Sequence, residues 1–252
     1  KHPEYRHWGR INFEGLKLST SETRMAIERK EYAGWDDSRL PFLPALRRRG
    51  YKPEAFRKFA LEIGLSLADK SVSQEEFWKM INAFNREIIE PKANRYFFVK
   101  DAVEVTIQGE PKREVKINLH PDHPKRGQRT LSVEGKVYLA HDDVKKLGKG
   151  KLHRLMDYCN FTINGNAWKF VSQEYEEYKN APNKGFIIHW LPADAKLPKV
   201  EVMLDSGSAV SGLGEKEMEK LSAGDIVQLE RMYYARLDKK EKGKLAFYYL
   251  HP

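Results

Sequence analysis

Apolar residues recur at helical spacing in the first part of the chain, residues 1–92. Between Pro53 and Leu67 they line one face of a helix, at Ala55, Phe56, Phe59, Ala60 and Ile63. Pro53 lies near the first turn of this segment and Gly64 near its end, and both positions are typical of helix boundaries. The pattern therefore predicts a helix here.

A second helical stripe begins after Ser73 and ends before Pro91. Glu76 follows Ser73 by three residues, which is the pattern of a capping box. The apolar positions of the stripe are Phe77, Met80, Ile81, Phe84 and Ile88. Such a stripe packs into a core far more often than it forms a functional surface. Pro91 should close the helix, because proline cannot continue the backbone hydrogen bonds.

From residue 93 to residue 252 the pattern changes to short runs that are typical of strands. The expected strands are Tyr96–Val99, Val103–Ile107, Val115–Leu119, Gly135–Leu139, Phe161–Ile163, Ala167–Val171, Gly185–Leu191, Lys199–Leu204, Asp225–Leu229 and Lys244–Leu250. The turns between them are rich in Gly, Pro, Asn and Asp, and no long helical pattern separates them. This arrangement favours antiparallel β-barrels over a parallel sheet.

The charge of the chain points to an acidic partner. Lys and Arg outnumber Asp and Glu by 45 to 36, which leaves a net charge of +9. A basic balance of this size favours nucleic acid or an anionic membrane surface. No apolar run approaches the length of a spanning helix, and no lipidation signal is present, so we expect no membrane partner.

The single cysteine, Cys159, cannot form an internal disulfide or hold a zinc ion alone. This fits a reducing cytosol, and we expect a cytoplasmic protein with Cys159 as a packed thiol.

The segment His120–Pro124 holds two His and one Asp between prolines, which favours a rigid turn over a metal site. His189 and Trp190, in an apolar strand, are expected in the core. We therefore expect no metal site.

A short loop at Gly15–Ser21 is the strongest local signal near the start of the chain. Its Lys, Ser and Thr side chains and its backbone N–H groups suit a phosphate. On composition alone, an ordinary polar loop is the better interpretation. The chain also opens without Met and enters dense motifs at once, so we expect it to start inside a longer protein.

The order of the surrounding segments changes that interpretation. The loop stands among the runs Tyr5–Phe13, Gly34–Pro41, Ala45–Tyr51 and Ala93–Tyr96. In this order the sequence resembles the archaeal and eukaryotic-type glutamyl-tRNA synthetases and their close relatives, the glutaminyl-tRNA synthetases. The resemblance covers essentially the whole chain and is weakest across residues 206–224. Within it, Lys17–Ser21 looks like the KMSKS element of class I synthetases.

Two alternatives stay open beside the glutamyl type. Thr20 stands where the general motif has its second Lys, and the Ser-Thr-Ser form is similar to the archaeal glutamyl branch. Glutaminyl enzymes tend to a Ser-Lys-Arg form, but the amino-acid pocket that would separate the two types is not in this chain. The other alternative is a free-standing RNA-binding β-barrel protein. The Lys17–Ser21 loop argues against it, because a pure binding module has no use for an activation loop.

The resemblance implies a mostly β, α+β fold in three parts. Residues 1–27 would be a remnant of the catalytic domain, residues 28–92 a helical stem-contact subdomain, and residues 93–252 two antiparallel β-barrels that bind the anticodon. The family's HIGH element and its ATP and glutamate pockets belong to an upstream domain that is absent here. The full enzyme would use ATP and Mg²⁺ to join glutamate to tRNA. We expect this chain alone to bind neither cofactor and to be inactive.

The resemblance also assigns roles to individual residues. Those near the ATP phosphates would be Lys17, Ser19, Thr20 and Ser21. Arg95, Gln228 and Arg231 would contact the middle anticodon base, and Arg154 the third. The glutaminyl enzymes have a second Arg where this chain has Met156, so nothing beyond Arg154 is carried over there. For each residue the alternative is a surface or ion-pair role, such as a pair between Arg231 and Glu230.

Two basic clusters would contact the tRNA backbone. One runs from Lys145 to Arg154 and includes Lys145, Lys146, Lys149 and Lys151, although a plain solvated loop explains its charge equally well. The other is Arg47 and Arg48, followed by Arg49 and Gly50. On its residues this second cluster is first of all a helix C-terminus, where the dipole favours cations. The expected partner is tRNA-Glu, with tRNA-Gln as the alternative, and the expected state is a monomer.

Overall fold

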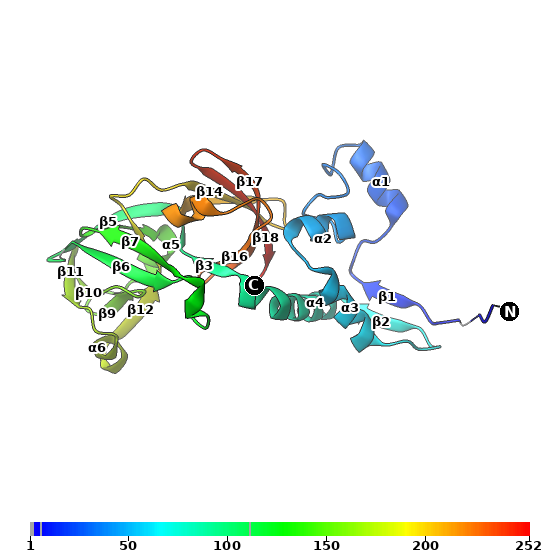
Figure 1. Cartoon of the computed structure of the whole chain (residues 1–252), viewed down its shortest axis with the longest axis horizontal. Helices are drawn as coiled ribbons and strands as arrows, with labels where there is room; N and C mark the ends of the chain where they lie inside the picture. The colour runs from blue at the N-terminus through cyan, green and yellow to red at the C-terminus, as the bar shows by residue number, and fades with distance from the viewer. Residues whose placement is uncertain (1–2, 6, 111) are drawn as a thin grey trace.

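The structure, a computed structural model, describes residues 3–5, 7–110 and 112–252. Lys1, where the sequence begins, and Arg6, within the Tyr5–Phe13 run, lie outside these residues. The described part is elongated (Figure 1), with helices α1 to α4 at one end and a seven-stranded sheet at the other. A second seven-stranded sheet lies between them. Within the described ranges, no helix is long and apolar enough to cross a membrane.

Four helices and two parallel strands form the helical end. They are β1 (Ile11–Glu14), α1 (Thr20–Glu28), α2 (Leu43–Arg49), α3 (Pro53–Ile63), β2 (Lys70–Ser73) and α4 (Gln74–Ile89). The two predicted helices are α3 and α4. Gly64 caps α3, Ser73 Oγ accepts a hydrogen bond from Glu76 N at 3.1 Å, and the 3-10 helix η1 (Glu90–Lys92) follows α4. Their apolar faces share one core.

The sheet at the far end has the strand order β12-β9-β10-β11-β5-β8-β13. Its strands are β5 (Ala102–Gln108), β8 (Lys136–Ala140), β9 (Leu152–Leu155), β10 (Asn160–Asn164), β11 (Ala167–Ser172), β12 (Lys184–Ile188) and β13 (Leu191–Pro192). The separate hairpin of β6 (Arg113–Asn118) and β7 (Gln128–Val133) shares its core. We call this unit the first barrel. Its connections include η2 (Pro124–Arg126), α5 (His141–Lys146) and α6 (Tyr175–Asn180).

The middle sheet has the order β3-β16-β17-β18-β14-β15-β4 and is called the second barrel. Its strands are β3 (Asn94–Tyr96), β4 (Phe98–Lys100), β14 (Lys199–Met203), β15 (Ala209–Gly214), β16 (Ile226–Leu229), β17 (Tyr233–Glu241) and β18 (Lys244–His251). The 3-10 helix η3 (Lys216–Lys220) follows β15. Because only Phe97 separates β3 from β4, the chain joins the two edges of the sheet and curves it into a barrel-like unit.

The predicted strand Tyr96–Val99 is therefore divided at Phe97. Phe97 packs into the core of the first barrel, whereas Tyr96 and Phe98 pack into that of the second. The strands β1, β2, β7, β9, β15 and β17 were not predicted. In β7 the buried alternating positions begin with Arg129, and a charged residue conceals the apolar alternation. In β15 the two glycines, Gly212 and Gly214, have the same effect.

The prediction of a mostly β chain with β-barrels beside a helical part is confirmed. The pairing differs from a purely antiparallel one, because four ladders in the two barrels are parallel. They are β11–β5, β12–β9, β14–β18 and β16–β3. The reason is topological: the chain leaves a sheet and re-enters it after a long connection, so the returning strand can run in the same direction.

Candidate nucleic-acid interface

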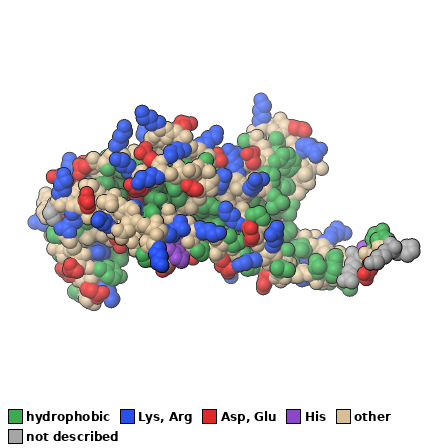
Figure 2. All heavy atoms as spheres, in the orientation of Figure 1, with side chains coloured by type: hydrophobic (Ala, Val, Ile, Leu, Met, Phe, Trp, Pro, Cys, Tyr) green, Lys and Arg blue, Asp and Glu red, His purple; other side chains and the backbone are tan. Residues whose placement is uncertain are grey.

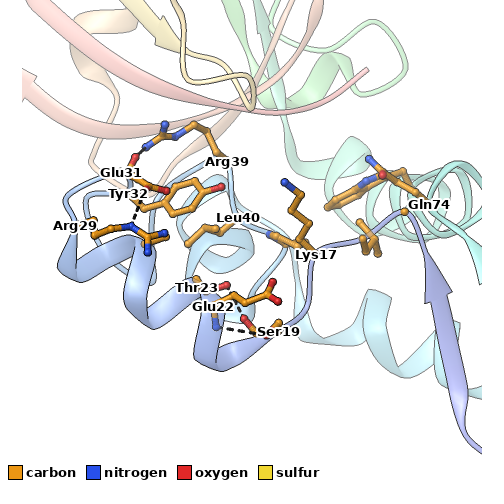
Figure 3. Close-up of a pocket in the computed structure, with 15 residues that line it drawn as sticks. Lys17, Ser19, Glu22, Thr23, Arg29, Glu31, Tyr32, Arg39, Leu40 and Gln74 are labelled. Atoms are coloured by element: carbon orange, nitrogen blue, oxygen red, sulfur yellow. Dashed lines mark hydrogen bonds and ion pairs between the residues drawn. The ribbon is translucent and has the colours of Figure 1, made fainter.

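A pocket of about 480 Å³ lies between the β1–α1 connection, the segment after α1 and the start of α4. We call it the Lys17 pocket; Figure 3 shows Lys17 and Gln74 across it from Glu31, Tyr32 and Arg39. Ser19 caps α1, and its Oγ accepts from Glu22 N at 3.4 Å. The predicted loop Lys17–Ser21 is thus partly helical. Thr20 and Ser21 form the first turn of α1 and do not line the pocket.

The cations of the Lys17 pocket differ in what they already bind. Arg29 lies 2.7 Å from the Glu31 carboxylate, and Arg39 lies 2.7 Å from that of Asp37. The hydrogen bond from Arg39 lowers the pKa of Asp37 to about 2 and outweighs the effect of burial. Lys17 makes no side-chain hydrogen bond or ion pair within the described residues. Lys17 and the N-terminus of α1 are therefore the groups available to an anion.

A second pocket, of about 530 Å³, lies where the two barrels meet. We call it the Arg95 pocket. It is lined by Arg95 of β3, Arg154 of β9, Asp157 after β9, Glu230 after β16 and the β6–β7 hairpin with its turn. The hairpin contributes Lys116, Ile117, Asn118, Pro121, Gln128 and Arg129. The parallel register of β16 and β3 places Gln228 beside Arg95. The structure thus brings Arg95 and Arg154 together in one pocket, and it places Gln228, which does not line the pocket, beside Arg95.

Arg95 is held only loosely by its neighbours. Its guanidinium lies 3.5 Å from the Glu90 carboxylate and 3.7 Å from that of Glu230. Arg95 Nε and Gln228 Oε1 are buried without a hydrogen-bond partner. Buried polar atoms are nearly always satisfied in folded proteins, so two unsatisfied atoms on neighbouring strands are unusual.

Arg154 is almost fully buried at the same pocket. Its Nη1 donates to Asn160 Oδ1 at 2.8 Å and to Gln173 O at 2.9 Å, and its guanidinium lies over the ring of Tyr175. Asn160 in turn donates to Ser172 and Glu174. The orientation of Arg154 is therefore set by the protein before any ligand arrives.

Arg231 does not line the Arg95 pocket. Strand β16 ends at Leu229, and Arg231 has a left-handed backbone with φ of 63°, so a simple alternation of strand faces does not apply to it. Its Nη1 donates to Asp143 at 3.1 Å and to His189 Nδ1 at 3.2 Å. The alternative of an ion pair between Arg231 and Glu230 is not found: Arg231 pairs with Asp143, and Glu230 faces Arg95.

His189 is buried, as predicted for a core residue, and it fixes Arg231 through a defined tautomer. Its Nε2–H donates to Phe98 O at 2.7 Å, so Nδ1 is left to accept from Arg231. Burial, followed by the nearby Arg231 charge, lowers the pKa of His189 to about 4. The neutral ring therefore joins the first barrel to the turn after β16.

The sequence did not reveal the ion pair of Arg129 and Glu215 beside the Arg95 pocket. Arg129 Nε lies 2.9 Å from Glu215 Oε1, with exposed fractions of only 2% and 0%. Glu215 also accepts from Phe97 N at 2.5 Å, and Arg129 Nη1 donates to Asn118 O at 2.6 Å. Burial raises the pKa of the Glu215 carboxyl, and Arg129 opposes that effect. The pair ties the hairpin to both barrels at their junction.

The four lysines of the first basic cluster are exposed. Lys145 and Lys146 end α5, and Lys149 and Lys151 follow in the loop. The base of this loop is held by the buried His153, whose Nε2 donates to Gly148 O at 2.9 Å. Its Nδ1 accepts from Phe186 N at 3.0 Å, and burial lowers the pKa of the ring. In Figure 2, Lys and Arg side chains are spread along the whole face shown.

The arginines at the end of α2 have separate roles. Gly50 caps the helix with φ of 115°, which confirms the interpretation of this run as a helix C-terminus. Arg49 is buried and donates to Leu250 O at 2.8 Å and Tyr249 O at 3.1 Å. Arg48 is paired with Asp36 and Asp238 at 2.9 and 3.1 Å. Only Arg47 of the three makes no ion pair or side-chain hydrogen bond within the described part of the chain.

The segment His120–Pro124 forms a turn, as expected. His120 Nδ1 accepts from Asp122 N at 3.2 Å, and its Nε2–H donates to Glu90 O at 3.0 Å. Both ring nitrogens are thus used inside the protein. Within the described ranges, no three residues of the types His, Cys, Asp and Glu gather closely enough to hold a metal ion.

Comparisons with known proteins match three segments of the chain to one family. Residues 1–91 match a family model described as the catalytic domain of class I tRNA synthetases (E and Q). Residues 93–179 and 187–238 match two models described as anti-codon binding domains of the same class.

The chain is also similar to archaeal proteins named glutamate–tRNA ligase. It is 41% identical over 251 residues to that of Methanobrevibacter smithii and 43% identical over 250 residues to that of Methanothermobacter thermautotrophicus, with 99% of this chain and 43% of each relative covered. For that of Pyrococcus furiosus the identity is 42% over 260 residues, 100% of this chain and 44% of the relative. The chain thus spans less than half the length of these relatives. With catalytic-domain residues followed by anticodon-binding domains, it belongs to the class I tRNA synthetases of the glutamate and glutamine type.

Proposed function

We propose that this chain is the tRNA-binding portion of a glutamate–tRNA ligase and that its Arg95 pocket receives a base of the anticodon of tRNA-Glu. The observation that carries the proposal is the pair of buried, unsatisfied atoms, Arg95 Nε and Gln228 Oε1, on neighbouring strands of the second barrel. A ligand that accepts one hydrogen bond and donates another would satisfy both atoms once the two side chains turn toward the pocket.

The chemistry of the Arg95 pocket suits a base edge better than a phosphate. Arg95 and Arg154 offer planar forks of donors, while Glu230 offers a carboxylate that accepts hydrogen bonds. A phosphate would be repelled by Glu230, whereas an unstacked base presents both donors and acceptors on its edge. Arg231 would act on the same base indirectly, by holding the turn that carries Glu230.

In this proposal the three parts of the chain follow the tRNA from stem to anticodon. Residues 1–27 belong to the catalytic side, residues 28–92 contact the stem, and residues 93–252 bind the anticodon. The exposed Lys145, Lys146, Lys149 and Lys151, together with Arg47 and Arg48, would meet backbone phosphates, and such contacts position the RNA without reading its sequence. Arg48 would do so only with its pairs to Asp36 and Asp238 weakened.

The Lys17 pocket is proposed to face the phosphates of ATP in the full enzyme. Lys17 and Ser19 line this pocket, whereas Thr20 and Ser21 form the first turn of α1 without lining it. Together they would supply a charge and backbone donors for a phosphate. When bound, ATP with Mg²⁺ would supply the adenylyl group that activates the glutamate carboxylate. The part played by this chain is to orient the phosphate groups.

Titration of the chain with labelled transcripts tests the proposal. We expect tighter binding of tRNA-Glu than of the same tRNA with its middle anticodon base replaced. Equal affinity for all anticodons would contradict the base-reading role of the Arg95 pocket. Tighter binding of tRNA-Gln would instead assign the chain to the glutaminyl type.

A further inference from the structure

The turn between β14 and β15 of the second barrel lies against the wall of the Lys17 pocket. Ser38 Oγ donates to Leu204 O in this turn at 3.2 Å. Arg49 Nη2 lies 3.4 Å from the Asp205 carboxylate. The turn, residues 204–208, is thus held against Ser38 and against the end of α2 by contacts between distant parts of the chain.

The closest approach is between Gly207 and Arg39. A Cβ atom at Gly207 would lie 2.7 Å from Arg39 Cδ, which is too close for both atoms to stay in place, and 3.3 Å from Arg39 Cγ, which is a tight contact. Gly207 also has φ of +86°, a left-handed backbone that favours glycine. The contact therefore depends on the absence of a side chain at residue 207.

Arg39 cannot simply swing away from this contact. Its Nε and Nη2 donate to the two carboxylate oxygens of Asp37 at 2.8 and 2.7 Å, and Nη2 also donates to Glu31 O at 2.7 Å. Its guanidinium lies over the ring of Tyr32 at 4.6 Å. A displacement of Arg39 would therefore also move the backbone around Glu31, just after α1.

Arg39 contacts both the Lys17 pocket and the β14–β15 turn. It lines the Lys17 pocket together with Lys17 and Ser19, and Figure 3 shows its guanidinium directed toward Glu31. On its other side it touches the β14–β15 turn. From β14 the hydrogen-bonded order runs through β18, β17 and β16 to β3, the strand that carries Arg95. One continuous sheet thus extends from the Arg95 pocket to the turn that contacts Arg39.

We propose that Gly207 is a positioning residue for the Lys17 pocket: its contact with Arg39 sets the placement of α1 and joins the sheet of the Arg95 pocket to the Lys17 loop. The consequence for phosphate binding rests on the role proposed above for the Lys17 pocket. The positioning of α1 does not depend on that role, so an experiment can contradict the phosphate role and still support the positioning contact.

The test compares Gly207→Ala with the matched control Gly243→Ala. Gly243 lies in the β17–β18 turn of the same sheet and also has a left-handed backbone, with φ of +73°, but a Cβ there would meet no atom within 4 Å. Both variants carry the same kind of backbone strain, and only the first creates the contact with Arg39. Each is also made in an Arg39→Ala background.

Amide hydrogen exchange of Thr20–Glu28 and of residues 31–40 is the first measurement. We expect faster exchange in both segments for Gly207→Ala, by about fivefold, as for groups in direct contact, and no change for Gly243→Ala. In the Arg39→Ala background, Gly207→Ala should add nothing further. Equal exchange in the two glycine variants, or an effect of Gly207→Ala that persists without Arg39, overturns the proposal.

Calorimetric titration with inorganic pyrophosphate is the second measurement. Gly207→Ala should weaken its binding about fivefold relative to Gly243→Ala. If the unmodified chain binds no pyrophosphate but exchange in α1 still responds to Gly207→Ala, the proposed phosphate role fails and the positioning contact stands. Pyrophosphate binding that is equal in both variants, with exchange also unchanged, contradicts the proposal.

Discussion

Arg95 and Gln228 lie directly beside one another across the parallel pair β3–β16, although they stand in opposite halves of the chain. Each contributes a buried atom without a partner, Nε from Arg95 and Oε1 from Gln228. This relationship makes the pair the centre of the proposed base site. Glu230, two residues beyond Gln228, completes the site with an acceptor that faces Arg95.

Replacement of Arg95 should separate base reading from phosphate contact. We expect Arg95→Ala to weaken binding of tRNA-Glu by about 1–3 kcal/mol, with a smaller loss for a tRNA whose middle anticodon base is altered. Arg95→Lys should lose much of the same discrimination, because a point charge does not copy a planar fork. Affinity is measured by anisotropy and the melting temperature by calorimetry. A barrel that unfolds, or an equal loss for every tRNA, would make Arg95 a structural or phosphate-contacting residue.

The exposed lysines should act through salt-dependent phosphate contacts. Lys146→Gln with Lys149→Gln should reduce affinity for cognate and non-cognate tRNA alike and flatten the slope of log K against log salt by about 0.7–0.9 per lost contact. Lys242→Gln, in the exposed β17–β18 turn, is the control for net charge. An unchanged slope in the double variant would show that this loop is only a solvated surface.

The chain alone should bind tRNA without activating glutamate. The residues present supply Lys17 and the start of α1 for phosphates, and they match the catalytic model over residues 1–91 only. We therefore expect ATP–pyrophosphate exchange at background level while a gel shift with tRNA-Glu shows a complex. Exchange above background that is lost on Lys17→Ala would show that the chain itself activates glutamate, and would contradict the prediction.

The buried His189 should make stability depend on pH in mild acid. Its pKa is about 4 in the folded chain and about 6.5 when unfolded, so the unfolded state takes up the proton first as pH falls. Stability should therefore decrease from about pH 6.5 to pH 4, by on the order of 1–3 kcal/mol for this group. Buried His251, with a pKa also lowered to about 4, acts in the same direction. In urea unfolding, the free energy of unfolding of His189→Gln should depend less steeply on pH. His141→Gln, at an exposed site, is the control and should keep the original pH dependence.

Removing one partner of the Arg129–Glu215 pair should lower the free energy of unfolding strongly, whereas replacing both partners with apolar residues should lower it little. Glu215→Ala leaves Arg129 buried without its partner, and we expect a loss of about 3–5 kcal/mol in the free energy of unfolding. The double variant Arg129→Met, Glu215→Leu should recover most of that loss, since neither charge is then buried. If the single and double variants are equally destabilised, the pair is not what holds the barrel junction.

Local sequence determined the parts of this protein whose chemistry is local. The ends of α3 and α4 follow from Pro53, Gly64 and the Ser73 cap, and most strands follow from alternation, because capping and side-chain periodicity depend on near neighbours alone. The family, too, was predictable from the order of short runs, and the comparisons confirm it.

Only the tertiary structure decided how these parts meet. Nothing near Phe97 in the sequence shows that β3 and β4 close the opposite edges of a sheet whose other strands come from residues 199–251. The same long-range pairing puts Arg95 beside Gln228, holds Arg231 on Asp143 rather than in the Arg95 pocket, and buries Arg129 against Glu215. Register and burial are set by the partner strand. A charged residue such as Arg129 can stand at a core position only because Glu215, from the second barrel, supplies its counter-charge.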